Sequence, residues 1–428
     1  MKKENLYELL LKDYNDGLNY SGVKGERLAN RLTTISNIGL TKDGGSNRPG
    51  FSDKENQAKN LVKKWMEEAG LEVSEDNAGN TFGKLTGRKP DLKAILSGSH
   101  LDSVPNGGHF DGPLGVLAAL EVVESWKDTN FIPNRSFEVV IFIDEEGARF
   151  NKGLHGSQAM IGGIKEENIK SLVDQNGLYF GDVLKNRGLN IRNFINSKRN
   201  LDNIELFIET HIEQGKILEK AKSPVGIVTG IAGPCWLEFQ LEGMADHAGN
   251  TPMDNRNDAL VAASDLILQI NALPKSISSS AVATVGKMQV FPNAINVIPG
   301  KVNFFVDIRD IYEDTRDELV GKIIDILKIV TKKYNVHYTW HERLRVNPIP
   351  IKELIQKKLA TSIKENGLSP ISLPSGAGHD AMVVGKQVPV AMLFVQSKDG
   401  VSHNPNEWSS LNNCIHSIHV LKHFIENY

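Results

Sequence analysis

Residues 93–115 read KAILSGSHLDSVPNGGHFDGPLG, the most informative segment of the chain. Its beginning, residues 93–98, is a short strand-like run, and residues 137–144, FEVVIFID, form a second one. Short uninterrupted runs of this kind are typical of strands buried on both faces of a mixed or parallel sheet. Between them, residues 115–126 have the apolar spacing of a helix and follow a glycine-rich turn. The order strand, loop, helix, strand predicts an α/β domain.

A different rhythm begins near residue 231 and predicts an inserted α+β domain. We expect, in order, a strand at 234–243, a helix at 257–273, strands at 281–291 and 296–309, a helix at 314–334 and a strand at 336–345. This β-α-β-β-α-β order predicts a four-stranded antiparallel sheet with two helices on one face. The α/β pattern returns with a helix at 352–366 and a strand at 388–395.

The predicted fold class is therefore α/β, with two domains. A discontinuous mixed-sheet domain covers residues 1–230 and 349–428, and the inserted domain covers residues 231–348. A sheet with one bare face and an exposed edge often binds a partner. We therefore expect a homodimer that forms through the inserted domain.

Composition excludes several classes of protein. The 428 residues are 40% hydrophobic and 24% charged, which is ordinary for a globular chain, and the net charge of −3 favours neither nucleic acid nor an anionic membrane as a partner. Residues 1–20 predict an amphipathic opening helix rather than a signal peptide. No run approaches the roughly 18 to 20 apolar residues of a membrane-spanning helix, so we expect a cytoplasmic protein. Cys235 and Cys414 are expected to be free buried thiols without a role.

Candidate chemistry lies where the first predicted strand ends. His100 and Asp102 follow residue 98, and Asp111 lies in the glycine-rich loop. Imidazole and carboxylate groups at the carboxyl end of a sheet strand suit a borderline-soft divalent metal. Asp102 can also accept the free ring N–H of His100 and set its tautomer. The same three residues are compatible with an ordinary hydrogen-bonded turn, and that alternative stays open here.

Two further clusters follow strand-like runs. Glu145 and Glu146 end the second strand, where one glutamate can hold a metal while the other acts as a general base. His211 lies in ETHIEQG at residues 209–215, after the apolar run IELFI. Each cluster alone also fits a solvated turn, but three of them at strand ends favour a metal site. Other candidate histidines are His247, His379 and His403, whereas a structural or surface place is expected for His109, His155, His337, His341, His416, His419 and His423.

Eight motifs in sequence order carry a resemblance to a known family. They are GSHLDSVPNGGHFDGPLGVL, EEGARF, HIEQG, GIAGPCW, ADHAGNTPM, NVIPGKVNFFVDIRD, SGAGHDA and SHNPNEW, between about residues 95 and 408. The chain closely resembles the hydantoinase/carbamoylase family of amidohydrolases, within the larger group of dimetal aminoacylases and carboxypeptidases. Members of the family include N-carbamoyl-L-amino-acid hydrolases, β-ureidopropionases and allantoate amidohydrolases. The resemblance implies a dimetal hydrolase domain with an inserted dimerisation and lid domain.

The resemblance also implies roles for single residues. One metal would be held by His100, Asp111 and His211, and a second by Asp111, Glu146 and His403. Glu145 matches the general base, and Asp102 joins it and His247 as a candidate catalytic residue. The cofactors implied are two divalent ions per subunit, zinc or manganese, with cobalt or nickel also compatible. The residues alone did not separate His403 from His379 as a ligand.

Substrate contacts are implied as well, and the family positions that match are Gln214, His247, Asn296, Arg309, Gly378 and His379. Arg309 offers a planar fork for a carboxylate, although it can instead pair with Asp307 or Asp310 on its own strand. His247 or His379 can donate to an oxygen that becomes negative during the reaction. Asn250 stands where the family more often has threonine or alanine, and this changes the surroundings of His247.

The expected function is metal-dependent hydrolysis of the ureido C–N bond of N-carbamoyl-L-amino acids, which gives the L-amino acid, carbon dioxide and ammonia. The substrate would be a small carbamoyl or ureido compound with a carboxylate. GIAGPCW, at residues 230–236, favours this reading over the alternative of an allantoate amidohydrolase. A peptidase or aminoacylase of the same group is third. A non-catalytic scaffold is disfavoured, because the general base and every proposed ligand are present.

Overall fold

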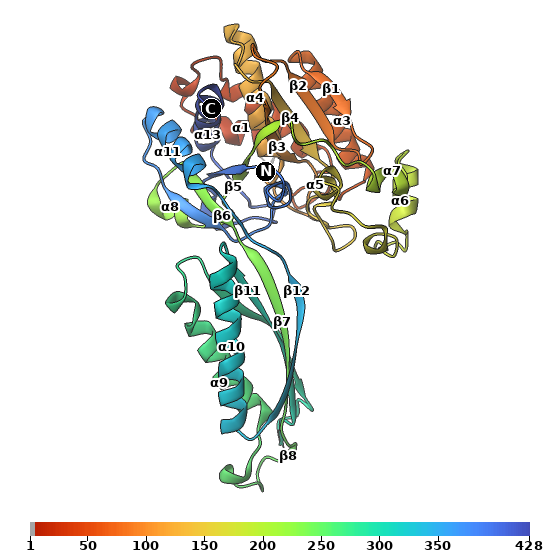
Figure 1. The fold of residues 1–428 in the computed structure, drawn as a ribbon, viewed down its shortest axis with the longest axis vertical. Helices are drawn as coiled ribbons and strands as arrows, with labels where there is room; N and C mark the ends of the chain where they lie inside the picture. Colours follow the sequence, from red (N-terminus) through yellow and green to blue (C-terminus); the bar gives the residue numbers. More distant parts are fainter. Residues whose placement is uncertain (1–4) are drawn as a thin grey trace. The chain divides into compact units, whose positions relative to one another are not determined.

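The helices and strands of the computed structural model, which describes residues 5–428, fall into two units. Unit 1 comprises Met1–Thr229, Ile351–Leu373 and His379–Tyr428. Unit 2 comprises Gly230–Pro350 and Pro374–Gly378. Unit 1 is built on a mixed sheet and unit 2 on an antiparallel one, as Figure 1 shows for each. The α/β fold class predicted from the sequence is confirmed.

The sheet of unit 1 runs in the order β1-β2-β4-β3-β5-β15-β6, and β14 also pairs with β6. Its strands are β1 (Glu72–Glu75), β2 (Thr81–Leu85), β3 (Ala94–His100), β4 (Phe137–Phe142), β5 (Ile204–Ile212), β6 (Val225–Ile231), β14 (Ser372–Ser375) and β15 (Val390–Val395). The four central strands β4, β3, β5 and β15 are parallel. Every residue of β3 and β4 is buried, which explains why their sequences are continuous rather than alternating.

Helices surround this sheet. They are α1 (Leu6–Leu11), α2 (Gly25–Asn37), α3 (Asp53–Glu68), α4 (Pro113–Thr129), α5 (His155–Met160), α6 (Phe180–Asn186), α7 (Ile191–Ile195), α8 (Ile217–Ala221), α11 (Glu353–Glu365), α12 (Asp380–Val384) and α13 (Leu411–Glu426). Helix α4 is buried from Pro113 to Trp126, because it packs against β3 and β5 and its two glutamates, Glu121 and Glu124, pair with arginines of α2. Proline at its first position suits a helix start, since that N–H would have no partner in the helix.

Unit 2 has the element order expected from the sequence. Its elements are β7 (Gly233–Glu242), β8 (Asp246–His247), α9 (Ala259–Ala272), β9 (Val282–Phe291), β10 (Val297–Ile298), β11 (Lys301–Asp310), α10 (Glu313–Lys333), β12 (His337–Arg345) and β13 (Ile349–Pro350). Four of the strands form an antiparallel sheet in the order β12-β7-β11-β9. Helices α9 and α10 lie side by side along it (Figure 1), and their apolar residues join one core with alternate residues of β7 and β11.

Two expected elements differ in extent. The predicted opening helix is limited to α1, which ends at Leu11 before the polar turn that contains Asn15 and Gly17, while residues 1–4 lie outside the described part of the chain. The strand expected at 296–309 is divided, because Pro299 and Gly300 separate β10 from β11. β10 pairs with β8 instead of joining the four-stranded sheet.

The two cysteines are buried free thiols, as expected. Burial raises the pKa of Cys414 to about 12 and that of Cys235 to about 11. Both thiols therefore stay protonated at neutral pH. Among residues 5–428, no helix combines the length and the apolar character needed to cross a membrane.

The core of unit 2 yields a prediction about stability. Phe304 is fully buried and its ring stacks on that of Phe239 at 5.2 Å, whereas the next residue, Phe305, points to the opposite face and is half-buried. We expect Phe304→Ala to lower the free energy of unfolding of unit 2 by about 3–5 kcal/mol, since it removes a ring from a closed core. Urea unfolding measures this, with Phe305→Ala as the matched control. Equal losses in the two variants would contradict the prediction.

A second prediction concerns His419 on α13. It donates from Nε2 to the carbonyl oxygen of Leu18 at 2.9 Å and stacks on Tyr20 with 3.8 Å between ring centroids. Burial lowers the pKa of His419 to about 4. The unfolded chain, where a histidine titrates near 6.5, binds the proton first, so this group's stabilisation is complete above about pH 6.5 and is lost as the pH falls towards 4.

We therefore expect the wild-type protein to lose stability between pH 6.5 and pH 4.5 more steeply than His419→Gln. The variant lacks the imidazole whose pKa is about 4 in the folded protein. Glutamine keeps an N–H donor but does not titrate. Thermal unfolding across this range measures the difference. Parallel pH profiles for the two proteins would show that His419 is not responsible.

Candidate metal centre

Two groups of side chains in unit 1 have the composition and spacing of metal sites. They are His100, Asp111 and His211, and Asp111, Glu146 and His403, and within each group the possible ligand atoms lie within 4.8 Å of one another. Asp111 belongs to both groups. Its two carboxylate oxygens face different partners, which is the arrangement of a ligand that bridges two ions.

The distances show how Asp111 divides its oxygens. Oδ1 lies 3.1 Å from Nε2 of His211 and 3.6 Å from Nε2 of His100. Oδ2 lies 3.3 Å from Nε2 of His403, and that nitrogen is also 3.3 Å from Oε2 of Glu146. Each oxygen therefore faces its own set of nitrogen and carboxylate donors.

Strand order explains why these residues meet. β3 lies between β4 and β5 in parallel, so His100 at the end of β3 is close to His211 on β5 and to Glu146 just after β4. Asp111 lies in the loop between β3 and α4, and His403 follows β15. All of them lie at the carboxyl edge of the parallel strands, where open α/β sheets bind ligands.

Backbone conformation at the site is unusual in two ways. Gly112 has φ +83°, and a Cβ there would lie 2.4 Å from the His100 ring, so only glycine lets the loop pass over the imidazole. Asp144, Gln214 and His403 also have positive φ, of 52°, 55° and 54°. Residues with side chains are held in this region only where the surroundings enforce it, and they often lie at functional sites.

The buried polar atoms fit a cation. Nε2 of His100 is buried without a hydrogen-bond partner, which is rare in folded proteins. Its Nδ1 lies 3.2 Å from the carbonyl oxygen of Asp102, and Nδ1 of His211 lies 3.0 Å from the carbonyl oxygen of Ile212. Protons on both Nδ1 atoms leave the Nε2 lone pairs directed at Asp111, as metal-binding histidines require.

The charges around His100 point the same way. Burial disfavours a charge on its ring, yet Glu145, Asp102 and Asp111 outweigh burial and raise the pKa of His100 well above its usual value. Burial raises the pKa of Glu145 well above its usual range, and burial together with Asp111 raises that of Glu146 to about 8. A buried cluster so rich in carboxylates is stabilised by positive charge, and a divalent ion supplies it.

Asp102 serves a wider role than the sequence indicates. Its Oδ1 lies 3.2 Å from Nδ1 of His100, as expected, but it also accepts the backbone N–H of Glu145 at 3.1 Å. Its Oδ2 accepts the backbone N–H of Glu146 at 3.1 Å. One carboxylate therefore orients the histidine at the end of β3 and both glutamates that follow β4.

Sequence reasoning missed two residues that hold Asp111. Glu407 accepts the backbone N–H groups of Phe110 and Asp111 at 2.8 and 3.1 Å, and Ser402 donates its hydroxyl to Oδ2 of Asp111 at 2.8 Å. Both residues lie in the SHNPNEW motif on either side of His403. The only signal in the sequence was the acidic residue Glu407, which lies in the same motif as His403.

Two expected substrate-contacting residues lie at this cluster. Gln214 donates from Nε2 to Oδ2 of Asp111 at 2.8 Å. The His379 ring lies 4.4 Å from the His211 ring and is almost fully buried. Burial and the charge of His211 lower the pKa of His379 well below its usual value, so its imidazole is neutral.

The remaining candidates belong to unit 2. His247 and Asn296 are exposed and adjacent, since His247 pairs with Val297 in the β8–β10 ladder. Nδ1 of His247 accepts the backbone N–H groups of Gly249 and Asn250, so Asn250 contacts this histidine through its backbone. All three residues lie in unit 2.

Arg309 has the intrastrand partner that the alternative interpretation named. Nε and Nη2 donate to the Asp307 carboxylate, the latter at 2.8 Å, and Nη1 donates to the carbonyl oxygen of Gly376 at 2.7 Å, in the segment that contains Gly378. These bonds use part of the five N–H groups of a guanidinium.

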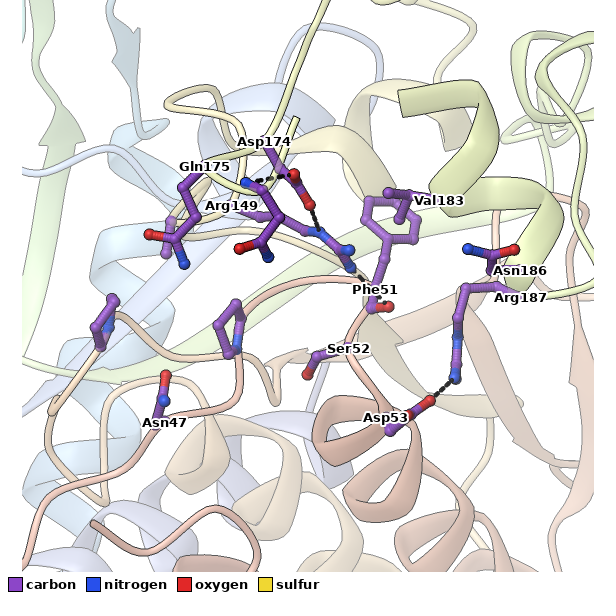
Figure 2. Close-up of a pocket in the computed structure, with 14 residues that line it drawn as sticks. Asn47, Phe51, Ser52, Asp53, Arg149, Asp174, Gln175, Val183, Asn186 and Arg187 are labelled. Carbon is purple, nitrogen blue, oxygen red and sulfur yellow. Dashed lines mark hydrogen bonds and ion pairs between the residues drawn. The ribbon is translucent and has the colours of Figure 1, made fainter. Parts of the chain in front are cut away.

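Beside the turn that follows β4 there is a cavity of about 480 Å³. Figure 2 shows Arg149 at its centre, ion-paired with Asp174, with Phe51, Ser52 and Asp53 at the start of α3 below it. The cavity contains none of the candidate ligands, although Ala148 and Arg149 follow Glu146 directly. It is therefore a neighbour of the cluster and not the cluster itself.

Comparison with known proteins gives consistent matches. The model described as Peptidase family M20/M25/M40 matches residues 96–427. The chain is 41% identical over 403 residues to the N-carbamoyl-L-amino acid amidohydrolase of Geobacillus stearothermophilus, covering 94% of this chain and 98% of that protein. It is 35% identical over 376 residues to the allantoate amidohydrolase of Bacillus subtilis (strain 168), covering 88% and 91%. A solved amidase of the hydantoinase/carbamoylase family from Burkholderia multivorans superposes with a TM-score of 0.88 at 33% identity, covering 95% of this chain and 98% of that one.

The shared position of Asp111 leads to a prediction about metal binding. We expect Asp111→Asn to weaken binding at both groups, His211→Asn at one and His403→Asn at the other. Each loss should exceed the roughly 10- to 100-fold loss typical of groups that only orient a ligand. Metal content after dialysis against a series of buffered zinc or manganese concentrations measures this. A single binding class that all three variants weaken equally would contradict a two-group centre.

Proposed function

Because this chain belongs to peptidase family M20/M25/M40, we propose that it hydrolyses the ureido C–N bond of N-carbamoyl-L-amino acids. The products are the L-amino acid, carbon dioxide and ammonia. Family membership confirms the resemblance that the sequence motifs carried. The observation that carries the proposal is the pair of donor groups that share Asp111, with the unligated carboxylate of Glu145 beside them.

The proposed cofactors are two divalent ions per chain. His100, Asp111 and His211 would hold one, and Asp111, Glu146 and His403 the other. Nitrogen and carboxylate donors without a thiolate suit zinc or manganese, and they are compatible with cobalt or nickel. When bound, such ions supply Lewis-acid activation of water and of the carbonyl group under attack.

Glu145 is the proposed general base. Its Oε2 lies 3.7 Å from Nε2 of His100, at the edge of the first donor group, and its backbone N–H is held by Asp102. Burial favours the protonated form of this carboxyl, which makes it a stronger base than an exposed glutamate. Glu145 takes a proton from the attacking water, and then returns it to the leaving nitrogen as the C–N bond breaks.

Other residues would bind the substrate. His379 is neutral and buried, so it can donate an N–H to the carbonyl oxygen without adding charge, and His247 is the candidate from unit 2. Arg309, with N–H groups beyond those given to Asp307, would take the carboxylate, assisted by Asn296, Gln214 and Gly378. We further propose a cytoplasmic homodimer that forms through unit 2.

Allantoate is the second candidate substrate. It is also a small ureido compound with a carboxylate, and the amidohydrolases of Bacillus subtilis and Escherichia coli that bear its name are 35% and 31% identical to this chain. The higher identity of 41% to a carbamoyl-amino-acid hydrolase and the GIAGPCW segment favour the first candidate. The same metals and the same base would serve either reaction.

Ammonia release from a panel of compounds tests the proposal. The panel contains N-carbamoyl-L-amino acids, their D-forms, N-carbamoyl-β-alanine and allantoate, with metal-reconstituted and chelator-treated protein. Chelator-sensitive release from the L-carbamoyl compounds alone is the expected result. Release from allantoate alone would replace the first candidate by the second, and release from neither would overturn both.

The role of Glu145 gives a separate prediction. We expect Glu145→Gln to lower kcat by about 10²- to 10⁴-fold, which is the usual contribution of a positioned acid or base. Metal content and melting temperature should stay at wild-type values, because glutamine has the same size and Glu145 is not a proposed ligand. Retained activity, or a matching loss of metal, would contradict its assignment as the base.

A further inference from the structure

The turn that presents the two glutamates is held by buried carboxylates at three successive backbone N–H groups. Asp102 accepts the N–H of Glu145 with Oδ1 and that of Glu146 with Oδ2, both at 3.1 Å. The preceding N–H, that of Asp144, donates to Oε1 of Glu55 at 3.2 Å. Glu55 lies far outside every motif that carries the family resemblance, and before the residues that the family model matches.

This turn needs support because its backbone is strained. Asp144 has φ +52°, a region that residues with side chains rarely adopt. Its Oδ2 lies 2.6 Å from Nδ1 of His155, and a Cβ at Gly50 would lie 1.8 Å from its Oδ1. The segment before α3 therefore presses against the turn, and only glycine at position 50 leaves room for the Asp144 carboxylate.

Helix capping explains only half of what Glu55 does. Ser52 caps α3 by accepting the N–H of Glu55 at 3.1 Å, and a glutamate at that position usually reaches back to the start of its own helix. Oε2 of Glu55 does so, by accepting the N–H of Phe51. Oε1 instead leaves the helix and binds the turn, 89 residues away in sequence.

The turn segment also reaches back to the start of α3. Arg149, three residues after Glu146, donates from Nη1 to the carbonyl oxygen of Phe51 at 3.1 Å, as Figure 2 shows beside the cavity. The peptide groups on both sides of Phe51 are thus held, one by Glu55 and one by Arg149. Residues 51–55 and 144–149 are tied together in both directions.

We propose that Glu55 is a positioning residue for the catalytic turn, and this rests on the proposed function of Glu145. Asp102 holds the turn from the end of β3, and Glu55 holds it from the start of α3. Without the bond from Glu55, the strained Asp144 peptide can rotate and carry the Glu145 carboxylate away from the water it activates. Binding of the substrate, which other residues provide, should change little.

Glu55→Gln is the test, because glutamine keeps the size but has one acceptor oxygen and an NH₂ group that must face an N–H donor. We expect kcat to fall by about 10- to 100-fold, the usual cost of losing a group that orients an active residue. KM should stay within about twofold, since the loss falls on the transition state.

Glu121 on α4 offers a matched control. It is as buried as Glu55 and also accepts a backbone N–H, that of Lys24 at 2.8 Å, but its other contacts are to Arg27, away from the turn. Glu121→Gln should lower the melting temperature and leave kcat unchanged. Equal losses of kcat in the two variants at similar stability would show that Glu55 is merely structural and would overturn the proposal.

Hydrogen exchange separates this proposal from the proposed function. Amide exchange of peptides that cover residues 143–150 should be faster in Glu55→Gln than in wild-type protein, and unchanged in Glu121→Gln. This readout needs no turnover, so a wild-type protein inactive on the whole panel would overturn the proposed function alone. Unchanged exchange in Glu55→Gln would overturn the positioning role. If that variant does not fold, fast exchange of the Asp144 amide in the wild-type protein would overturn the role instead.

Discussion

One electrostatic constraint underlies the structure. Several carboxylates are buried around the central carboxylate of Asp111. Asp111, Glu145 and Glu146 come within reach of His100, His211 and His403, and of these side chains only that of His403 is largely open to water, at 51% exposed. Charges of one sign cannot be buried together unless positive charge or directed hydrogen bonds compensate them. The histidines and the proposed cations compensate the charge of the central carboxylates, and the surrounding loops supply the hydrogen bonds.

Those loops share one hydrogen-bonding arrangement, in which a buried carboxylate accepts two backbone N–H groups. Asp102 does this for residues 145 and 146, Glu407 for residues 110 and 111, and Glu213 for Ile217 and Leu218. Each carboxylate loses the hydration of its charge but gains strong hydrogen bonds, and each amide is fixed in direction. The Asp144 amide, where φ is +52°, is held by a further buried carboxylate, that of Glu55.

Much of this could be predicted from the sequence, because the informative signals are local. The buried strands, the glycine loop after His100 and the order of elements in unit 2 follow from periodicity and turn residues over short windows. The predicted element boundaries were wrong where proline, glycine or a polar turn interrupts an otherwise regular pattern. Pro299 and Gly300 divide an apparently continuous strand, and the polar turn at Asn15 ends the opening helix early.

The sequence alone indicated which side chains are candidate donors, because several of them directly follow apolar strand-like runs. Strand ends and a glycine-rich loop made His100, Asp111, Glu146 and His211 candidates, whereas only the family resemblance separated His403 from His379 as a ligand. The pairing of each buried carboxylate with particular backbone N–H groups depends on tertiary packing. Glu55 meets the Asp144 amide and Glu407 meets Asp111 across 89 and 296 residues, and contacts of that range arise from packing, which no local pattern records.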